Sequence, residues 1–197
     1  VQVLAEASLA LSRGELAQQS AAHDLTVTEA AYLARCRDKT AALFSTACRL
    51  GALTGGTDRE TEERLATFGE NVGLAFQIFD DILDLTGPTE RTGKRRGTDL
   101  KDGTVTLPLI LALQSEPALA DTIRAAQTGA DIEAVCDHLA THPGTIAARE
   151  RALGFVAAAR EVVDGPLDGV PREALHEIAN GVVDRYGFIE KLLRRIV

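Results

Sequence analysis

The segment from Thr57 to Leu85 limits the fold most strongly, because it has a helical period and, over its second half, apolar side chains in nearly every direction. A helix that is apolar all round is normally buried. Gly55-Gly56 before the segment and Gly87-Pro88 after it are typical breaks at helix ends. Gly69 and Gly73, four residues apart, would let a second helix approach closely. The segment therefore predicts a long buried helix within a helical protein.

The remaining sequence repeats helical periods with short breaks and shows no strand alternation. Thr26 with Glu29, and Thr57 with Glu60, match the capping box and predict the starts of two helices. The expected architecture is a single all-α domain over residues 1–197. The expected helices span about residues 1–22, 26–54, 57–85, 104–113, 117 onward, 131–141, 145–163, 171–186 and 188–196.

Composition narrows the classes of partner. The formal net charge of −8 argues against nucleic acid as the main partner. No run reaches the ~20 apolar residues of a transmembrane helix, so we expect no membrane span. Cys36, Cys48 and Cys136 form no CxxC pair and are expected to be reduced, as in a cytoplasmic protein. His138 and His142 are interpreted as a solvated helix end rather than a metal pair, because a proline follows at once.

Three aspartates interrupt the apolar helix: Asp80, Asp81 and Asp84. On a helix, Asp80 and Asp84 lie about 40° apart and Asp81 about 60° from Asp84, with Gln77 one turn earlier. Ionised carboxylates in an apolar setting must be paired, protonated or bound to metal. Mg²⁺ usually takes one or two carboxylates, several waters and substrate phosphates. The pattern favours a Mg²⁺–diphosphate site, and a solvated acidic stripe is the alternative.

The loop expected over residues 87–103 has glycines at 87, 93, 97 and 103 and carries five cations and three anions, in a chain that is acidic as a whole. Loops of this length are usually functional or disordered. Its cations, Lys94 and Arg96 among them, could close over a phosphate once a metal is bound. A charged loop without a role is the alternative interpretation.

Lys39 lies on the apolar stripe of its expected helix, seven residues after Tyr32 and four before Leu43. A lysine in that position most often extends its amine to solvent. An amine that faces a buried metal–diphosphate is the other explanation, and Thr40 would bring a hydroxyl to the same region.

Several segments, in chain order, resemble motifs of the trans-isoprenyl (polyprenyl) diphosphate synthase family. Together they cover most of residues 1–113. The second aspartate-rich motif of that family is similar to Gly73-xx-Phe76-Gln77-xx-Asp80-Asp81-xx-Asp84. The other matching segments are Gly14-Glu15 with Gln18, Lys39-Thr40-Ala41 followed by Gly51-Ala52, and Gly93-Lys94-xx-Gly97-x-Asp99-Leu100-xx-Gly103-xx-Thr106-Leu107-Pro108.

This resemblance implies an isoprenoid-synthase-type helical bundle and a Mg²⁺-dependent prenyltransferase. The implied reaction condenses isopentenyl diphosphate with an allylic prenyl diphosphate to give an all-trans polyprenyl diphosphate. Lys39 and Lys94 would contact the allylic diphosphate, while Thr40 and Gln77 would border the reacting carbons. The family also implies a homodimer. The residues assigned by resemblance are Asp80, Asp81, Asp84 and, through water, Asp99 for metal; Lys39, Thr40, Gln77 and Lys94 for catalysis; and Lys39, Thr40, Phe76, Gln77 and Lys94 for substrate binding.

The first aspartate-rich motif of that family, and the arginine pair that follows it there, are not found in the 197 residues. The chain begins at Val1 and contains no methionine, so we expect the natural protein to extend upstream and to carry the missing N-terminal helices. The 197-residue piece alone is expected to be inactive. Two alternatives stay open: a non-catalytic or complementary subunit of a heteromeric prenyl synthase, and a class I terpene cyclase.

Overall fold

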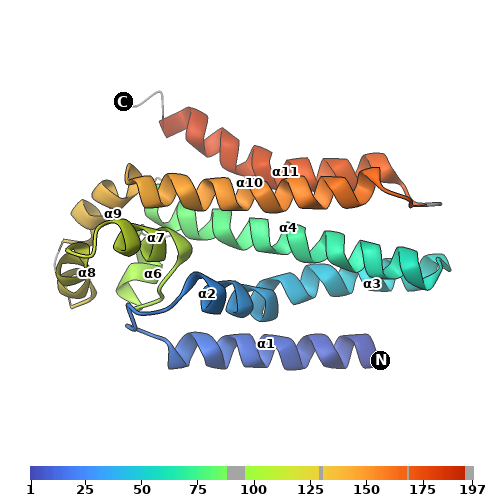
Figure 1. Ribbon diagram of the computed structural model, residues 1–197, viewed down its shortest axis with the longest axis horizontal. Helices are drawn as coiled ribbons and strands as arrows, with labels where there is room; N and C mark the ends of the chain where they lie inside the picture. The colour runs from blue at the N-terminus through green and yellow to red at the C-terminus, as the bar shows by residue number, and fades with distance from the viewer. Residues whose placement is uncertain (88–95, 129–130, 168, 194–197) are drawn as a thin grey trace. The chain divides into compact units, whose positions relative to one another are not determined.

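The computed structural model describes residues 1–87, 96–128, 131–167 and 169–193, with side chains as far as Asp184. In this part of the chain every regular element is a helix, which confirms the all-α prediction (Figure 1). The elements are α1 (Gln2–Ser20), α2 (Glu29–Cys36), the π-helix η1 (Arg37–Ala41), α3 (Ala42–Gly55), α4 (Arg59–Thr86), α6 (Thr98–Lys101), α7 (Leu107–Ser115), α8 (Leu119–Gln127), α9 (Ile132–Ala140), α10 (Pro143–Asp164) and α11 (Arg172–Leu193).

The chain divides into two compact units, and each draws on separate parts of the sequence. The first unit comprises Val1–Gly14, Cys36–Gln77 and Ala152–Val197, and the second comprises Glu15–Arg35 and Ile78–Arg151. The long helix α4 contributes residues to both. Among the described residues, no helix combines the length and the apolar character needed to cross a membrane.

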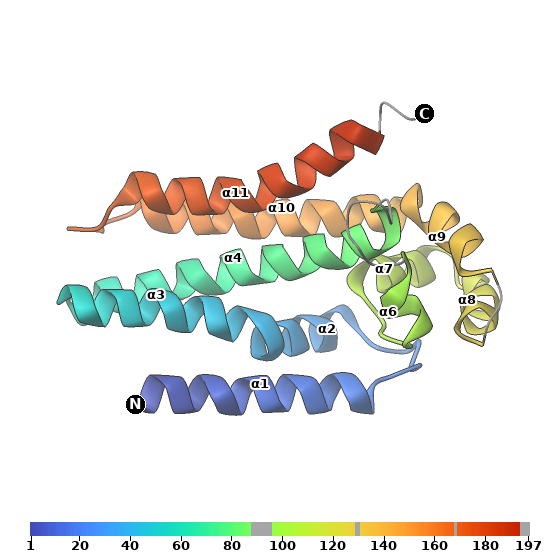
Figure 2. The same ribbon diagram turned by 180° about the vertical axis from the view of Figure 1, so that it is seen from behind.

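In the first unit, α3 and the first part of α4 form a helical hairpin that both views show side by side (Figures 1 and 2). The close approach predicted for the two α4 glycines is confirmed. A Cβ at Gly69 would lie 2.5 Å from the carbonyl oxygen of Phe44, and one at Gly73 would lie 2.6 Å from the Cα of Ala41. Glycine is therefore required where α4 crosses η1 and α3. In the same unit, α10 from Ala152 onward runs beside α11 (Figures 1 and 2).

The predicted helix starts are displaced, because other residues cap the helices. Thr28 and Asp58 each accept the amide three residues on, at 3.2 and 2.7 Å, in place of Thr26 and Thr57. Aspartate is a stronger N-cap than threonine. Thr57 instead belongs to the turn that ends α3, since its amide donates to the carbonyl of Ala52.

Two further predictions of helix limits are wrong. The helix expected over residues 26–54 contains the π-turn η1, a rare form that often occurs at functional positions. The last two predicted helices, 171–186 and 188–196, are one helix, α11, through the described part of the chain. Gly187 does not end it, because a glycine within a helix costs only about 1 kcal/mol and no proline follows.

In the second unit, the short helices α6, α7, α8 and α9 pack against one another. Helix α7 begins at Leu107, about three residues later than expected, and Pro108 lies in its first turn, where a missing amide proton matters least. Helix α6 lies inside the loop expected over residues 87–103, so the end of that loop is ordered by helical hydrogen bonds.

Candidate functional site

The three aspartates of α4 have different surroundings, although they lie within five residues of one another. Asp80 is exposed, Asp81 is only 5% exposed and Asp84 is half-buried. Successive residues on a helix point about 100° apart, so a rotation that turns Asp81 inward turns Asp80 outward. The three carboxylates therefore have different environments, which the sequence pattern alone did not distinguish.

Asp81 is held by a tyrosine from another helix of the same unit. The hydroxyl of Tyr32, which is fully buried, donates to Oδ2 of Asp81 at 2.6 Å. The guanidinium of Arg35 lies over the Tyr32 ring, 5.3 Å from its centroid, and donates to the carbonyl of Val105 at 2.7 Å. Sequence analysis placed Tyr32 on the stripe of Lys39 but missed this pairing, because nothing in the periodicity links positions 49 residues apart.

Asp84 is held by the start of α6. Its two carboxylate oxygens accept the amides of Thr98 at 3.1 Å and Asp99 at 3.0 Å, and its main-chain carbonyl accepts the amide of Gly97. Gly97 has a φ of 75°, and a Cβ there would lie 2.5 Å from Cγ2 of Ile132, so glycine is needed at this turn. Asp84 thus fixes the point at which the chain after α4 returns to it.

Of the two basic residues named in the predicted loop, the structure describes Arg96 and not Lys94. Arg96 is paired with Asp137 at 2.6 Å and with Glu133 at 2.9 Å, and its side chain is 16% exposed. Its charge is compensated by α9 in this structure, and the suggested closure of Arg96 over a phosphate once a metal is bound stays a prediction. Lys94 lies outside the described residues. Asp99, on α6, is half-buried, and its role through a metal-bound water stays a prediction.

In the first unit, Lys39 and Thr40 both lie on η1, and both are half-buried. The hydroxyl of Thr40 donates to Oε1 of Gln77 on α4 at 2.6 Å, so the two polar residues predicted to border the reacting carbons are brought together. The backbone of Lys39 lies against Gly14 of α1, where a Cβ would come within 2.5 Å of the Lys39 amide nitrogen.

Phe76, the residue before Gln77, packs its ring against Phe44 with the ring centroids 5.5 Å apart. This places one of the predicted substrate-binding residues in an aromatic pair between α3 and α4. Its predicted contact with substrate is not tested by the structure.

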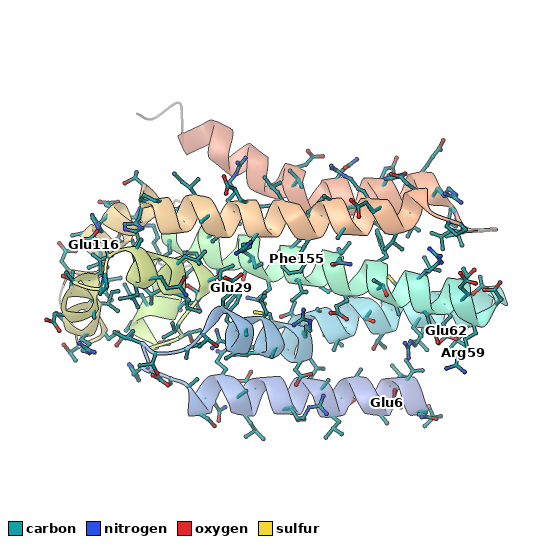
Figure 3. All side chains as sticks on the ribbon, in the orientation of Figure 1. Glu6, Glu29, Arg59, Glu62, Glu116 and Phe155 are labelled. Atoms are coloured by element: carbon teal, nitrogen blue, oxygen red, sulfur yellow. The ribbon has the colours of Figure 1, made fainter. Side chains whose placement is uncertain are left out.

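A second cluster of possible metal ligands lies away from the aspartates. Glu116, His138 and His142 have ligand atoms within 4.8 Å of one another, and Glu116 is labelled in Figure 3. The prediction of a solvated helix end is wrong for His142, which is 7% exposed. Its Nδ1 accepts the amide of Gly144 at 2.9 Å, so its Nε2 carries the proton and faces Glu116 at 3.5 Å. A metal ligand needs the opposite arrangement, with the second ring nitrogen donating, so this cluster fits a hydrogen-bonded imidazole.

The fold and the residues described above can be compared with known proteins. Residues 1–139 match the model of the family described as polyprenyl synthetase. This match covers more than half of the chain, and the protein therefore belongs to the polyprenyl synthetase family.

Relatives of the same family match over most of the chain. It is 33% identical over 187 residues to a prenyl transferase of Synechocystis, a match that covers 94% of this chain and 58% of the relative. It is 45% identical over 115 residues to component 2 of the heptaprenyl diphosphate synthase of Geobacillus stearothermophilus, covering 58% of this chain and 36% of the relative. The chain thus spans between about a third and three fifths of the length of these relatives.

Solved structures confirm the isoprenoid-synthase-type bundle. The heptaprenyl diphosphate synthase of Staphylococcus aureus superposes with a TM-score of 0.86 at 28% identity, over 92% of this chain and 58% of that one. A polyprenyl synthase of Caulobacter crescentus, solved in complex with calcium and isoprenyl diphosphate, gives 0.84 at 36% identity, over 92% and 57%.

Proposed function

We propose that this chain is part of a Mg²⁺-dependent prenyltransferase that condenses isopentenyl diphosphate with an allylic prenyl diphosphate to give an all-trans polyprenyl diphosphate. The observation that carries the proposal is that the three aspartates of α4 differ in their contacts and exposure. Asp81 and Asp84 are bound to protein groups, while Asp80 is exposed. Family membership supplies the reaction class, and the relatives bear names of prenyl transferases and prenyl diphosphate synthases.

The donor set fits Mg²⁺. In the described parts of the chain, the α4 aspartates do not form a cage of three carboxylates with oxygens within 4.8 Å of one another. A single exposed carboxylate suits an ion that takes its remaining ligands from water and a substrate diphosphate. Asp80 would hold the ion, Asp81 and Asp84 would act less directly, and Asp99 would hold a metal-bound water. Bound Mg²⁺ would supply Lewis-acid stabilisation of the leaving diphosphate.

The chain's own residues would act on substrate as follows. The cations of Lys39 and Lys94 would bind the allylic diphosphate and stabilise the charge that develops on it when the carbon–oxygen bond breaks. The double bond of isopentenyl diphosphate then forms the new carbon–carbon bond, and a proton is lost. Thr40 and Gln77 would present oxygens to the developing positive charge and assist that proton loss, with Phe76 in contact with the prenyl chain.

The reaction class is tested by product analysis on the complete protein. An allylic prenyl diphosphate should be elongated only when isopentenyl diphosphate and Mg²⁺ are both present, and a chelator should stop the reaction. Cyclic hydrocarbon formed without isopentenyl diphosphate would instead support a class I terpene cyclase.

A second candidate follows from the relatives described as component 2 of a heptaprenyl diphosphate synthase. The complete protein would then be one subunit of a heteromeric synthase. Turnover by the purified complete protein alone contradicts this candidate, whereas turnover only after addition of a second polypeptide supports it.

We also propose a homodimer in the cytoplasm. Leu4 and Leu9 of α1, both in the first unit, are exposed by more than half of their surface and would be available to pack against a second copy. Sedimentation of the complete protein tests the dimer, and a mass of one chain would contradict it.

A further inference from the structure

Tyr32 is buried in the second unit, where α2 meets Asp81 of α4. Its side chain is 0% exposed, and its hydroxyl lies 2.6 Å from Oδ2 of Asp81. A distance of 2.6 Å lies at the short end of the range for a hydroxyl donor, so the pair is a close hydrogen bond between two helices.

The tyrosine ring is itself fixed by Arg35. The guanidinium lies 5.3 Å from the ring centroid, within the range of a cation–π contact, and the side chain is 7% exposed. Its donation to the carbonyl of Val105 ties the same cation to the segment before α7. Arg35 thus limits where the Tyr32 hydroxyl can lie, because a shift of the ring would disturb its contact with the guanidinium.

The rotation of α4 about its axis follows from these contacts. Asp81 is held inward by Tyr32, and Asp84 is held by the amides that begin α6. Since neighbouring residues on a helix differ by about 100° in direction, two fixed aspartates determine the direction of Asp80. A carboxylate buried without its donor would either move toward solvent or distort the helix.

We propose that Tyr32 is a positioning residue: its hydroxyl keeps the Asp81 carboxylate out of the metal's coordination sphere and so fixes Asp80 as the direct metal ligand. This rests on the proposed function, because it assigns the ligand of the proposed Mg²⁺. In this proposal Tyr32 acts on the metal through Asp81, and Asp81 acts through position and not through coordination.

The test uses the complete protein and the variants Tyr32→Phe, Asp81→Asn and Asp80→Asn. Two quantities are measured: the Mg²⁺ concentration for half-maximal prenyl transfer, and the rise in melting temperature caused by Mg²⁺ with inorganic pyrophosphate. Tyr32→Phe keeps the packed ring and removes only the hydroxyl, so it should raise the half-activating Mg²⁺ concentration about tenfold and reduce the thermal shift. Asp81→Asn can still accept from Tyr32 and should weaken both responses less than Asp80→Asn, which should abolish them.

A matched control separates positioning from loss of stability. The hydroxyl of Thr145, 4% exposed, donates to the carbonyl of Leu139 at 2.7 Å. Thr145→Val removes this buried bond, which joins α10 to α9, so it should lower the metal-free melting temperature and leave the Mg²⁺ response unchanged. If Tyr32→Phe also lowers only the metal-free melting temperature, Tyr32 is merely structural and the inference fails.

Two other outcomes contradict the inference. Loss of the Mg²⁺ response in Asp81→Asn, to the extent seen in Asp80→Asn, would make Asp81 a direct ligand. If the wild-type protein shows neither Mg²⁺-dependent prenyl transfer nor a thermal shift with Mg²⁺ and pyrophosphate, the proposed function fails and this inference fails with it. A wild-type thermal shift without prenyl transfer would count against the proposed reaction only.

Discussion

Thr40 donates its hydroxyl to the side-chain oxygen of Gln77 at 2.6 Å, which joins the π-helix η1 to α4 within the first unit. A π-turn inserts an extra residue into a helix and changes the direction of the side chains around it. The turn and the hydrogen bond together determine where the Thr40 hydroxyl and the Gln77 amide lie.

Replacing Thr40 with valine keeps the shape of the side chain and removes the donor. The amide oxygen of Gln77 then loses this partner, and the free energy of unfolding should fall by about 1 kcal/mol. Turnover by the complete protein should fall more than this loss of stability explains. Thr40→Ser, which keeps the hydroxyl, is the control, and equal turnover in the valine and serine variants would contradict the role given to the hydroxyl.

Gly14→Ala should displace Lys39. The new Cβ would lie 2.5 Å from the Lys39 amide nitrogen, a backbone atom that cannot rotate away. The expected loss is about 1–3 kcal/mol of unfolding free energy, together with a higher KM for the allylic substrate.

Gly154→Ala is the matched control for this change, because a Cβ at Gly154 in α10 meets nothing within 4 Å. It should raise the unfolding free energy by about 0.5–1 kcal/mol, as alanine does at an open helical position. Equal effects of the two substitutions, measured by urea unfolding, would show that α1 does not pack against η1 as described.

Asp84→Ala should loosen the return of the chain at α6. Both carboxylate acceptors are removed from the amides of Thr98 and Asp99, so unfolding should become easier by about 1–3 kcal/mol. Hydrogen exchange at these two amides should accelerate, and Asp84→Asn, which keeps one acceptor, should give an intermediate rate. Unchanged protection of the Thr98 and Asp99 amides in the alanine variant would contradict the role given to the Asp84 carboxylate.

Cys136 gives a prediction in the alkaline range. Burial raises the pKa of its thiol from 9.0 to about 11, against the opposing effect of the Arg96 cation. Between pH 9 and pH 11 the Cys136 thiol loses its proton in the unfolded chain and keeps it in the folded chain. The contribution of Cys136 to the free energy of unfolding is therefore complete below pH 9 and is lost as the pH rises toward 11.

Urea unfolding of the wild type and of Cys136→Ala at pH 8 and pH 10 measures that contribution. The unfolding free energy of the wild type should fall more steeply with pH than that of the variant. Parallel changes in the two proteins would mean that the folded thiol ionises as readily as the unfolded one.

Local patterns in the sequence were sufficient for most of the helices. The close approach at Gly69 and Gly73 depends on residue size and backbone freedom, and it was predicted correctly. The helix limits failed where two local signals compete. Asp58, and not Thr57, caps the start of α4, and Gly187 lies within α11 without ending it.

The arrangement within the site could not be predicted in the same way. The burial of Asp81 depends on Tyr32, and the pairing of Arg96 depends on α9, and both contacts join residues that are far apart in the sequence. Helical periodicity gives the direction of a side chain on its own helix but does not identify the group it meets. Likewise, the burial of His142 results from packing that the following proline does not reveal.

The central claim is that Asp80 holds the Mg²⁺ on which prenyl transfer depends. The most direct measurement is the rate of isopentenyl diphosphate incorporation by the complete protein and its Asp80→Asn variant, as a function of Mg²⁺ concentration. Because Asp80 is exposed, the substitution should leave the melting temperature without metal unchanged. The account predicts Mg²⁺-dependent turnover in the wild type and a loss of at least about a hundredfold in the variant, equivalent to ~2.7 kcal/mol. Wild-type turnover retained by a folded Asp80→Asn protein would contradict it.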